Sequence, residues 1–371
     1  MKRHSLLLLL VIVLLLPACA NAICVKEEFV YYVIDLEPII GGYSSANSIN
    51  EKSQIVGEAE VLATLFDPTG SGNNVNLDPF GDYSRAESIN NCGQIVGWSL
   101  IESAGELGLR AMLFDPTGNG NNLVLGTLGG IESYAYSIND SGQIVGGAYD
   151  SSNRQRATLF DATGNGNNME LGTLGGPESC AYSINNKGEI IGYAETSLEN
   201  HHATLFDPTG GGNNIDLDIL GGGDSRAWSI NDEGQIVGCA ETSLGDLHAT
   251  LFDPTVGGNN TDLGTLGGIE SCAYSINNKG QIVGYAYNSS GDRRATLFDP
   301  TGNGSNIDLN TLIDPDSGWT LLAAGAINDN GWIVGGGINP DGELHAFLLV
   351  PEPATIALLG LGALLLRRCR K

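Results

Sequence analysis

The tripeptide Ser-Ile-Asn recurs along the chain, and this repetition limits the fold more than any other feature. It begins at Ser48, Ser88, Ser137, Ser183, Ser229 and Ser275, and a seventh copy reads Ala326-Ile327-Asn328. The spacings are 40, 49, 46, 46, 46 and 51 residues. A second marker, Ala-Thr-Leu-Phe or a close variant, also occurs seven times. Such a period indicates supersecondary units that are stable only when their neighbours stack on them.

Each unit has the pattern of four short strands. In the best-defined unit we expect strands over residues 179–184, 189–194, 203–206 and 215–220. The segment Asn185-Asn186-Lys187-Gly188 joins the first two strands, because Asn and Gly accept the positive φ of a tight hairpin turn. The high glycine content, 53 of 371 residues, suits short strands and tight turns.

The two ends of the repeat region predict ring closure. Four strands in 40–50 residues is the size of a propeller blade. The region starts with a single strand-like segment, residues 31–36, and ends on a third-strand segment, residues 345–349. The sequence therefore predicts an all-β fold, a seven-bladed propeller whose N-terminal strand completes the last sheet. An open solenoid or two sandwiches are the alternatives.

The N-terminus reads as an export signal. Lys2 and Arg3 precede a short apolar run, and the small residues Ala20, Asn21 and Ala22 form an Ala-x-Ala end. We expect a signal peptide over residues 1–22, cleaved after Ala22. A lipoprotein signal centred on Cys19 is the alternative.

The C-terminus carries a second signal. Pro351, Glu352 and Pro353 precede an apolar run over residues 354–366 and a basic end over residues 367–371. As a transmembrane-type helix this run spans about 20 Å, less than a hydrocarbon core, and the basic end suits the cytoplasmic side. The tail is thus expected to hold the protein transiently in the inner membrane. An ordinary weak anchor is the alternative.

The Pro-Glu-Pro motif, the short helix and the terminal arginines resemble the PEP-CTERM sorting domain. The resemblance covers residues 351–371 and leaves residues 23–350 as the repeat domain. It implies that an exosortase, a membrane enzyme with a cysteine nucleophile, cuts near Pro-Glu-Pro and passes the protein outward. It also implies the cell envelope, surface or extracellular matrix of a Gram-negative-type bacterium that makes exopolysaccharide.

The repeat markers resemble the extracellular HAF repeat family over residues 31–349. His345-Ala346-Phe347 matches the family pattern literally, whereas His202-Ala203 and His248-Ala249 match it in part. Other units depart from the pattern at the histidine. The replacements are Leu62, Arg110, Arg156 and Arg294. The resemblance implies an extracellular repeat scaffold and brings no known activity.

Charge excludes one class of partner. The chain has 43 acidic and 17 basic residues, a net charge of −26. Without the signal and the tail the net charge is about −31, so the surface repels nucleic acid and anionic lipid.

Four acids recur at one repeat position and are the candidate metal ligands. They are Glu132, Glu178, Asp224 and Glu270. A ring of carboxylates suits Ca²⁺, which takes oxygen ligands, but acids in loops are more often simply solvated. The loops of the type Asp115–Asn122 lack the spacing of an EF-hand, and Asx-turn chemistry explains them. The sequence thus predicts no cofactor, with Ca²⁺ as a weak alternative.

Two further residue sets invite a functional reading. His202, His248 and His345 share one position, but arginine occupies it in other units, so pairing with an acid is favoured over metal binding. Cys180 and Cys272 share a register and Cys239 lies opposite it, which allows buried core thiols or a bridge between blades.

No catalytic motif is present in the sequence, so we expect a protein that is not an enzyme. The hypothesis is an exported, surface- or matrix-associated binding scaffold whose partner is exopolysaccharide or an envelope protein. The alternative is an extracellular glycan hydrolase or lyase built on the same scaffold. A buried carboxylate pair about 5–10 Å apart would favour that alternative.

Overall fold

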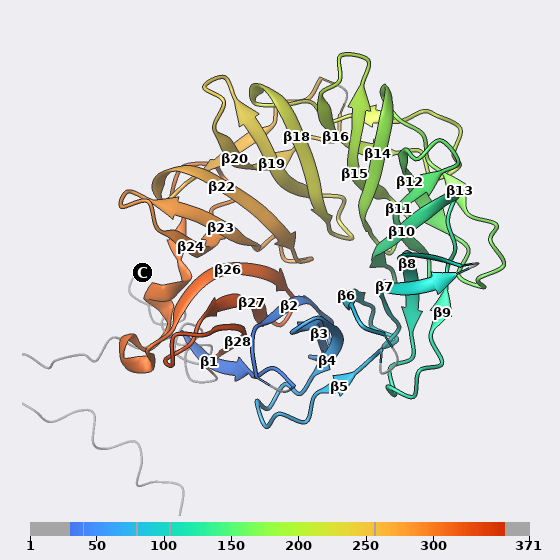
Figure 1. Ribbon diagram of the computed structural model, residues 1–371. Helices are drawn as coiled ribbons and strands as arrows, with labels where there is room; N and C mark the ends of the chain where they lie inside the picture. Colours follow the sequence, from blue (N-terminus) through green and yellow to red (C-terminus); the bar gives the residue numbers. More distant parts are fainter. Residues whose placement is uncertain (1–29, 40, 79–80, 104, 256, 353–371) are drawn as a thin grey trace, which may run out of the picture.

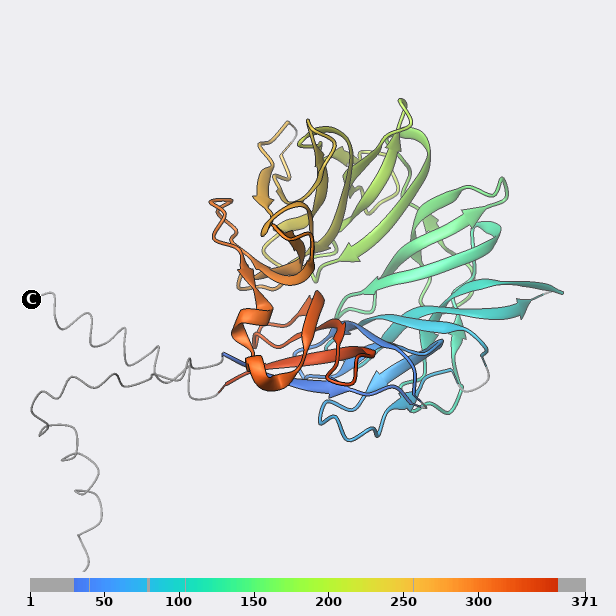
Figure 2. The same ribbon diagram turned by 60° about the vertical axis from the view of Figure 1, so that its left-hand side comes forward.

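The computed structural model describes residues 30–352, except residues 40, 79–80, 104 and 256. Within the described residues the chain forms seven four-stranded antiparallel sheets arranged in a ring, a seven-bladed propeller (Figures 1 and 2). The predicted fold class and the predicted number of blades are therefore confirmed.

The blades are numbered in chain order by their innermost strand. The first strands are β2 (Ser44–Ile49), β6 (Ser84–Ile89), β10 (Gly129–Ile138), β14 (Gly175–Ile184), β18 (Gly221–Ile230), β22 (Gly267–Ile276) and β26 (Thr320–Ile327). The second strands are β3 (Ile55–Ala59), β7 (Ile95–Ser103), β11 (Ile144–Asp150), β15 (Ile190–Thr196), β19 (Ile236–Thr242), β23 (Ile282–Asn288) and β27 (Ile333–Ile338).

The outer strands follow the same order. The third strands are β4 (Leu62–Phe66), β8 (Glu106–Phe114), β12 (Gln155–Phe160), β16 (His201–Phe206), β20 (Leu247–Phe252), β24 (Arg293–Phe298) and β28 (Leu344–Pro351). The fourth strands are β5 (Val75–Asn76), β9 (Leu123–Val124), β13 (Met169–Glu170), β17 (Ile215–Asp216), β21 (Thr261–Gly264), β25 (Ile307–Asp308) and, in the seventh blade, β1 (Tyr31–Leu36). Two short 3₁₀ helices, η1 (Leu309–Leu312) and η2 (Pro315–Ser317), lead into the seventh blade.

All four strands of the fourth blade differ from the prediction in their bounds, and the largest differences are in the first and fourth strands. The fourth strand of the fourth blade has two residues in place of the six expected, because the positive φ of 66° at Asp218 is incompatible with a continued strand, and Gly221, at a φ of 98°, begins the next first strand. Leu217 between them is buried and its N–H donates to the Ala203 oxygen at 2.8 Å, so it closes the sheet without continuing the ladder. First strands of the third to sixth blades therefore begin at the Gly-Gly of Leu-Gly-Gly.

The ring closes as the sequence predicts. β1 pairs antiparallel with β28, from Tyr31 opposite Pro351 to Leu36 opposite Ala346. In Figure 1 the two ends of the coloured chain, β1 and β28, accordingly lie side by side in one blade. The first and last parts of the repeat region are thus held in one sheet, which removes the open lateral faces of a linear array.

The hydrophobic core is divided among the junctions between blades. The cluster between the second and third blades, for example, joins Val96 and Leu125 with Ala135, Ile144 and Phe160. Equivalent clusters lie at the other junctions, including the one at the closure. Because each apolar face is covered only by the next sheet, no blade can bury its own core alone.

The serine of Ser-Ile-Asn joins neighbouring inner strands. Its hydroxyl oxygen accepts the backbone N–H of the isoleucine in the next blade at 3.3–3.4 Å, at six of the seven junctions. The exception is the junction between the seventh and first blades, where Ala326 replaces the serine. A second serine, such as Ser179 of Ser-x-Ala, accepts the N–H of Ala157 in the preceding blade at 2.9 Å.

A β-bulge interrupts every first strand directly before Ser-Ile-Asn. In the third blade Ala135 pairs with Gly146 and Ser137 with Val145, so Tyr136 is the extra residue. The bulge explains the glycine of Ile-Val-Gly, because a Cβ at Gly146 would lie 1.9 Å from the Tyr134 oxygen. A bulge re-aims the extra side chain, and the same register shift occurs in the other six blades.

Removing one asparagine of Ser-Ile-Asn should destabilise the whole ring. Asn185 is buried, accepts two N–H groups of its own turn, and donates to Glu189 and to the Asn231 oxygen of the next blade. We expect Asn185→Ala to lower the free energy of unfolding by about 1–3 kcal/mol, because buried polar groups lose their partners. Chemical denaturation measures this.

The matched control is Asn165→Ala. Asn165 is exposed and donates only to the Thr163 hydroxyl within its own loop. Its loss should change stability by less than about 0.5 kcal/mol. Equal effects of the two substitutions would contradict a special role for the inner asparagines.

Candidate functional site

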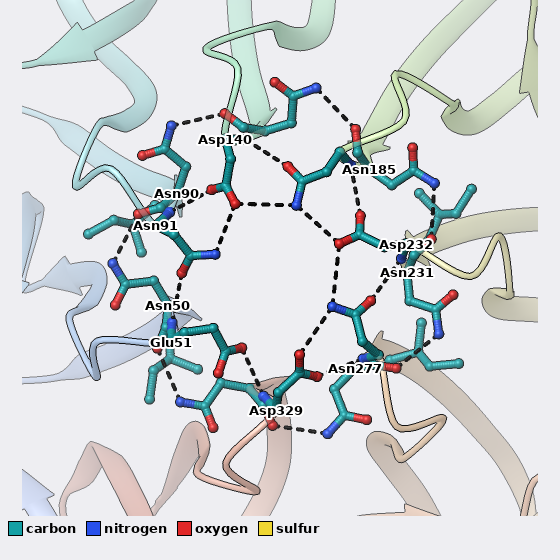
Figure 3. A pocket seen from close by; sticks show the side chains of 18 of the residues that line it. Asn50, Glu51, Asn90, Asn91, Asp140, Asn185, Asn231, Asp232, Asn277 and Asp329 are labelled. Carbon is teal, nitrogen blue, oxygen red and sulfur yellow. Dashed lines mark hydrogen bonds between the residues drawn. The ribbon is translucent and has the colours of Figure 1, made fainter.

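The asparagines of Ser-Ile-Asn form a closed ring at one end of the propeller axis (Figure 3). The Nδ2 of each donates to the backbone oxygen of its counterpart in the next blade over 2.9–3.1 Å. The seven members are Asn50, Asn90, Asn139, Asn185, Asn231, Asn277 and Asn328. The last bond, from Asn328 to Asn50, joins the seventh blade to the first and completes the ring.

The next residue of each turn forms a second ring. Its N–H donates to the side-chain oxygen of its counterpart in the next blade over 2.8–2.9 Å. The members in order are Glu51, Asn91, Asp140, Asn186, Asp232, Asn278 and Asp329. Amides and carboxylates alternate, so that Asn186 donates to both Asp140 and Asp232, at 3.3 and 3.1 Å.

Alternation cannot close in a ring of seven, and two acids therefore meet at the junction of the seventh and first blades. There Glu51 accepts the N–H of Asp329 at 2.9 Å, and the Asn330 amide lies 3.3 Å from its other oxygen. Burial raises the pKa of Glu51, and the charge of Asp329 acts in the same direction while its N–H opposes it. The polar atoms at this end are thus used to join the blades.

An axial cavity of about 680 Å³ lies farther along the inner strands, toward the loops that join second and third strands. Its defining residues are the seven bulge residues, one from each blade. They are Asn47, Glu87, Tyr136, Tyr182, Trp228, Tyr274 and Gly325. The cavity has the size of sites that bury drug-sized ligands, and its mixture of aromatic and polar groups is typical of such sites.

One wall of the axial cavity is aromatic. Tyr182 and Trp228 are stacked with their centroids 4.3 Å apart, and Tyr136 and Tyr274 meet this pair edge-on at 5.5 and 6.2 Å. These four residues come from the third to the sixth blade and form one continuous arc. Burial raises the pKa of Tyr136 and Tyr274, so their hydroxyls stay protonated at neutral pH.

The opposite wall is polar and centred on Arg85. Its Nε lies 3.5 Å from Glu87 and 3.7 Å from Glu58, and its terminal nitrogen donates to Asn47 at 3.0 Å. Glu87 also accepts the Trp98 indole N–H at 2.9 Å. Burial raises the pKa of Glu87, while the Arg85 charge opposes this effect.

The four acids named as weak candidates for a metal site lie one in each of four blades. The extended first strands place them inside β10, β14, β18 and β22, not in loops before the strands. Glu132 accepts the Tyr134 hydroxyl at 2.9 Å, and Asp224 accepts the His201 N–H at 2.9 Å. Glu178 and Glu270 occupy the equivalent place in their own blades. Within residues 30–352, no group of three or more His, Cys, Asp or Glu side chains is placed to hold a metal ion.

Each of the three repeat-position histidines hydrogen-bonds a carboxylate. His202 contacts Asp216 at 2.8 Å and His248 contacts Asp262 at 2.9 Å. His345 contacts Asp35 of β1 at 2.9 Å and so ties the closing strands together. Pairing with an acid, which the sequence favours, is what the structure shows.

The remaining candidates have structural roles in the described part of the chain. Asp115 accepts the N–H and hydroxyl of Thr117, and the Asn122 amide donates to the Leu77 oxygen of the preceding blade, which explains these loops without a ligand. Cys180, Cys239 and Cys272 are buried free thiols. The Cys239 sulfur accepts the Trp228 indole N–H at 3.3 Å.

The aromatic arc was missed by sequence reasoning, although its signal is present. The residue before Ser-Ile-Asn is Tyr, Tyr, Trp and Tyr in four consecutive units, at Tyr136, Tyr182, Trp228 and Tyr274. In a regular strand nothing would direct the side chain of this residue toward the propeller axis. The bulge turns this side chain into the axial cavity, and the alternation of apolar and polar residues does not reveal a bulge.

Comparison with known proteins identifies the tail. Residues 349–371 match the PEP-CTERM protein-sorting motif, and no curated protein matches the chain. The motif implies an exported, envelope-associated protein that an exosortase processes. Of the sorting signal, Pro351 ends β28 and the Glu352 N–H donates to the Val30 oxygen at 2.9 Å.

Several predictions made for the ends of the chain fall outside the described residues. They concern Ala20 and Ala22 of the signal peptide, Pro353, and the transmembrane-type helix of the tail. In the described part, no helix is long and apolar enough to cross a bilayer.

Stability should depend on pH through two of the histidines. The carboxylates of Asp216 and Asp262 raise the pKa of His202 and His248. A raised folded-state pKa stabilises the fold below the unfolded value of about 6.5, and this contribution is lost as pH rises through the folded-state value. We expect the free energy of unfolding to fall between these pH values, and the double variant His202→Gln/His248→Gln to show a weaker fall.

The control is His201→Gln, since the His201 ring packs against Tyr193 and has no ion pair among the described residues. Denaturant titrations at several pH values measure the effect. A pH profile that the double substitution leaves unchanged would refute the assignment.

Proposed function

We propose that the protein is an exported binding scaffold of the cell envelope that holds its ligand in the axial cavity and is not an enzyme. The observation that carries this proposal is that all seven bulge residues line that one cavity. A chain built from near-identical units has no structural need for five different residue types at this one position, where the blades carry Asn, Glu, Tyr, Trp or Gly. Variation there is expected where a ligand is recognised.

Location supports the proposal. The PEP-CTERM motif implies export and envelope association, and the resemblance to HAF repeats implies the same compartment. The large net negative charge keeps the molecule away from nucleic acid and anionic lipid. Exopolysaccharide and envelope proteins remain as partners that such a molecule meets after export.

Rigidity supports it as well. The cavity residues lie on inner strands that the two rings of hydrogen bonds connect from blade to blade. A site built on such strands is already ordered before its ligand arrives, so binding does not have to order it.

A hydrolase or lyase is the second candidate, and the acids near Arg85 favour it. Glu58 and Glu87 both lie within 4 Å of one arginine nitrogen and are largely buried, with side chains 8 % and 15 % exposed. However, Arg85 pairs with both acids, and Glu58 also accepts the Tyr43 hydroxyl. Both acids therefore have structural partners that account for them without catalysis, so binding is the better-supported function.

Processing of the chain is the first point to test. We expect the intact mass of the protein from the producing bacterium to lack residues 1–22 and the tail beyond about Pro353, since the sorting motif directs cleavage near Pro-Glu-Pro. Mass spectrometry of envelope and medium fractions measures this. Retention of Arg367 to Lys371 would show that the tail is an ordinary anchor.

Binding in the cavity is tested by filling it. A Cβ at Gly336 meets no atom within 4 Å and Gly336 lines the cavity, so Gly336→Phe places a ring in the site without removing a contact. We expect this variant to lose at least about tenfold in affinity for the extracellular polymer of the producing bacterium, because a ligand and the ring cannot share the volume. Cosedimentation with the polymer measures this.

The control is Leu198→Ala/Leu244→Ala, which changes two exposed residues in the loops between second and third strands. These loops are the other surface that varies among the blades. Loss of binding in this double variant but not in Gly336→Phe would move the binding site from the cavity to the loops. New reducing ends in the incubated polymer, absent with Glu87→Gln, would favour the hydrolase.

A further inference from the structure

The axial cavity contains a cation that the fold leaves without a counter-charge. Arg293 begins β24, and its guanidinium lies 3.9 Å from the centroid of the Tyr285 ring and 3.4 Å from the Tyr274 hydroxyl. Its Nε is buried and has no hydrogen-bond partner, and Arg293 forms no ion pair with a carboxylate of the described residues.

Four arginines in residues 30–352 have no ion pair with an acid, and of these Arg293 is the one that lines the axial cavity; the others are Arg110, Arg154 and Arg226. Arg85 pairs with two acids, Arg156 pairs with Asp150 and Glu170, and Arg294, the next residue, pairs with Asp292. Acids outnumber basic residues 43 to 17, so a carboxylate partner is easily supplied. At Arg293 an aromatic face takes that place and holds the guanidinium plane still, and the N–H donors that Tyr274 does not accept are left for a ligand.

The aromatic arc lies beside this arginine. Tyr274 contacts Arg293 and also meets Trp228 edge-on, so the cation and the stacked Trp228–Tyr182 pair belong to one continuous surface. Flat aromatic faces take the apolar C–H face of a sugar ring, and their polar edges remain available to its hydroxyls. Across the cavity, Asn47 and Glu87 add hydrogen-bonding groups for further hydroxyls.

We infer that the cavity binds a carboxylated sugar, a uronic-acid unit of an acidic polysaccharide. Arg293 takes the carboxylate through two parallel N–H donors, the geometry for which a guanidinium is suited. The pyranose ring packs on Trp228 and its neighbours. The acidic protein surface opposes the approach of every polyanion, so this inference concerns the single uronate unit whose carboxylate reaches Arg293. This inference rests on the proposed function and names its ligand class.

The test compares an acid with its neutral counterpart on the purified full chain. Oligogalacturonate and its methyl ester have the same backbone and differ in charge. We expect the acid to bind roughly tenfold or more tightly than the ester, because only the acid offers a charge-assisted pair to Arg293. Titration calorimetry gives the affinities, and tryptophan fluorescence reports contact with Trp228.

Substitutions test whether Arg293 causes the preference for the acid over the ester. We expect Arg293→Gln to reduce the ratio of acid to ester affinity to about one, Arg293→Lys to retain part of it, and the matched control Arg294→Gln to leave it unchanged. Unfolding midpoints of the variants show that the fold is intact. The ratio is read within each protein, so a general loss of stability does not imitate the effect.

The outcomes separate this inference from the proposed function. Equal affinity for acid and ester, an unchanged ratio in Arg293→Gln, or no binding of either oligomer would overturn the uronic-acid assignment. None of these results affects the test with Gly336→Phe, which asks only whether the polymer binds in the cavity. If Gly336→Phe still binds the polymer, the proposed function fails, and the assignment that rests on it fails with it.

Discussion

The structure depends on one repeated bond, the asparagine amide that donates to the backbone oxygen of its counterpart in the next blade. Each blade has two apolar faces and no means to cover them alone. The asparagine organises its own hairpin turn through Oδ1 and fixes the distance to the next turn through Nδ2, so one buried side chain sets both local and inter-blade geometry. Because the bond from Asn328 returns to Asn50, the ring has no free end, and the apolar clusters at all junctions are covered together.

The odd number of blades explains where the symmetry fails. A ring that alternates amides and carboxylates must bring two like groups together once, and it does so between Asp329 and Glu51. At the same junction Ala326 replaces the serine that joins inner strands elsewhere, and β1 from the other end of the repeat region supplies the fourth strand. The asymmetry extends into the cavity, where the third to sixth blades contribute aromatic residues and the remaining three contribute Asn47, Glu87 and Gly325. An asymmetric binding wall is thus compatible with a nearly symmetric scaffold, since the bonds that recur from blade to blade come from the serine and asparagine beside the bulge residue.

Much of the fold was predictable from the sequence because the same pattern of strands and turns recurs seven times. The number of blades, the hairpin turns and the closure by residues 31–36 follow from spacing and turn chemistry. Strand ends were less predictable, because the fourth strand is completed by Leu217 through a hydrogen bond outside the regular ladder. The cavity was not predicted, since a bulge adds one residue without changing the alternation that reveals a strand. For the candidate acids, by contrast, the repeat pattern is visible in the sequence but does not mark a site. Glu132 and Asp224 share a repeat position, which places them in different blades, and each hydrogen-bonds a local partner.

The place where the tail leaves the fold has a physical consequence for sorting. β28 pairs with β1 up to Pro351 opposite Tyr31, and Glu352 makes one further backbone bond to Val30. Closure of the ring and the Pro-Glu-Pro signal are therefore adjacent in the chain, but the pairing of the closing sheet is complete before the signal ends. A cut beyond Glu352 removes no hydrogen bond of that sheet. The inner strands that line the cavity belong to the same sheets but lie at their opposite edge, and the closed ring keeps their positions independent of the tail. Cleavage near the sorting motif and recognition of a ligand can thus be separate events in one molecule, because the hydrogen bonds and apolar clusters that hold the binding surface lie within residues 30–352.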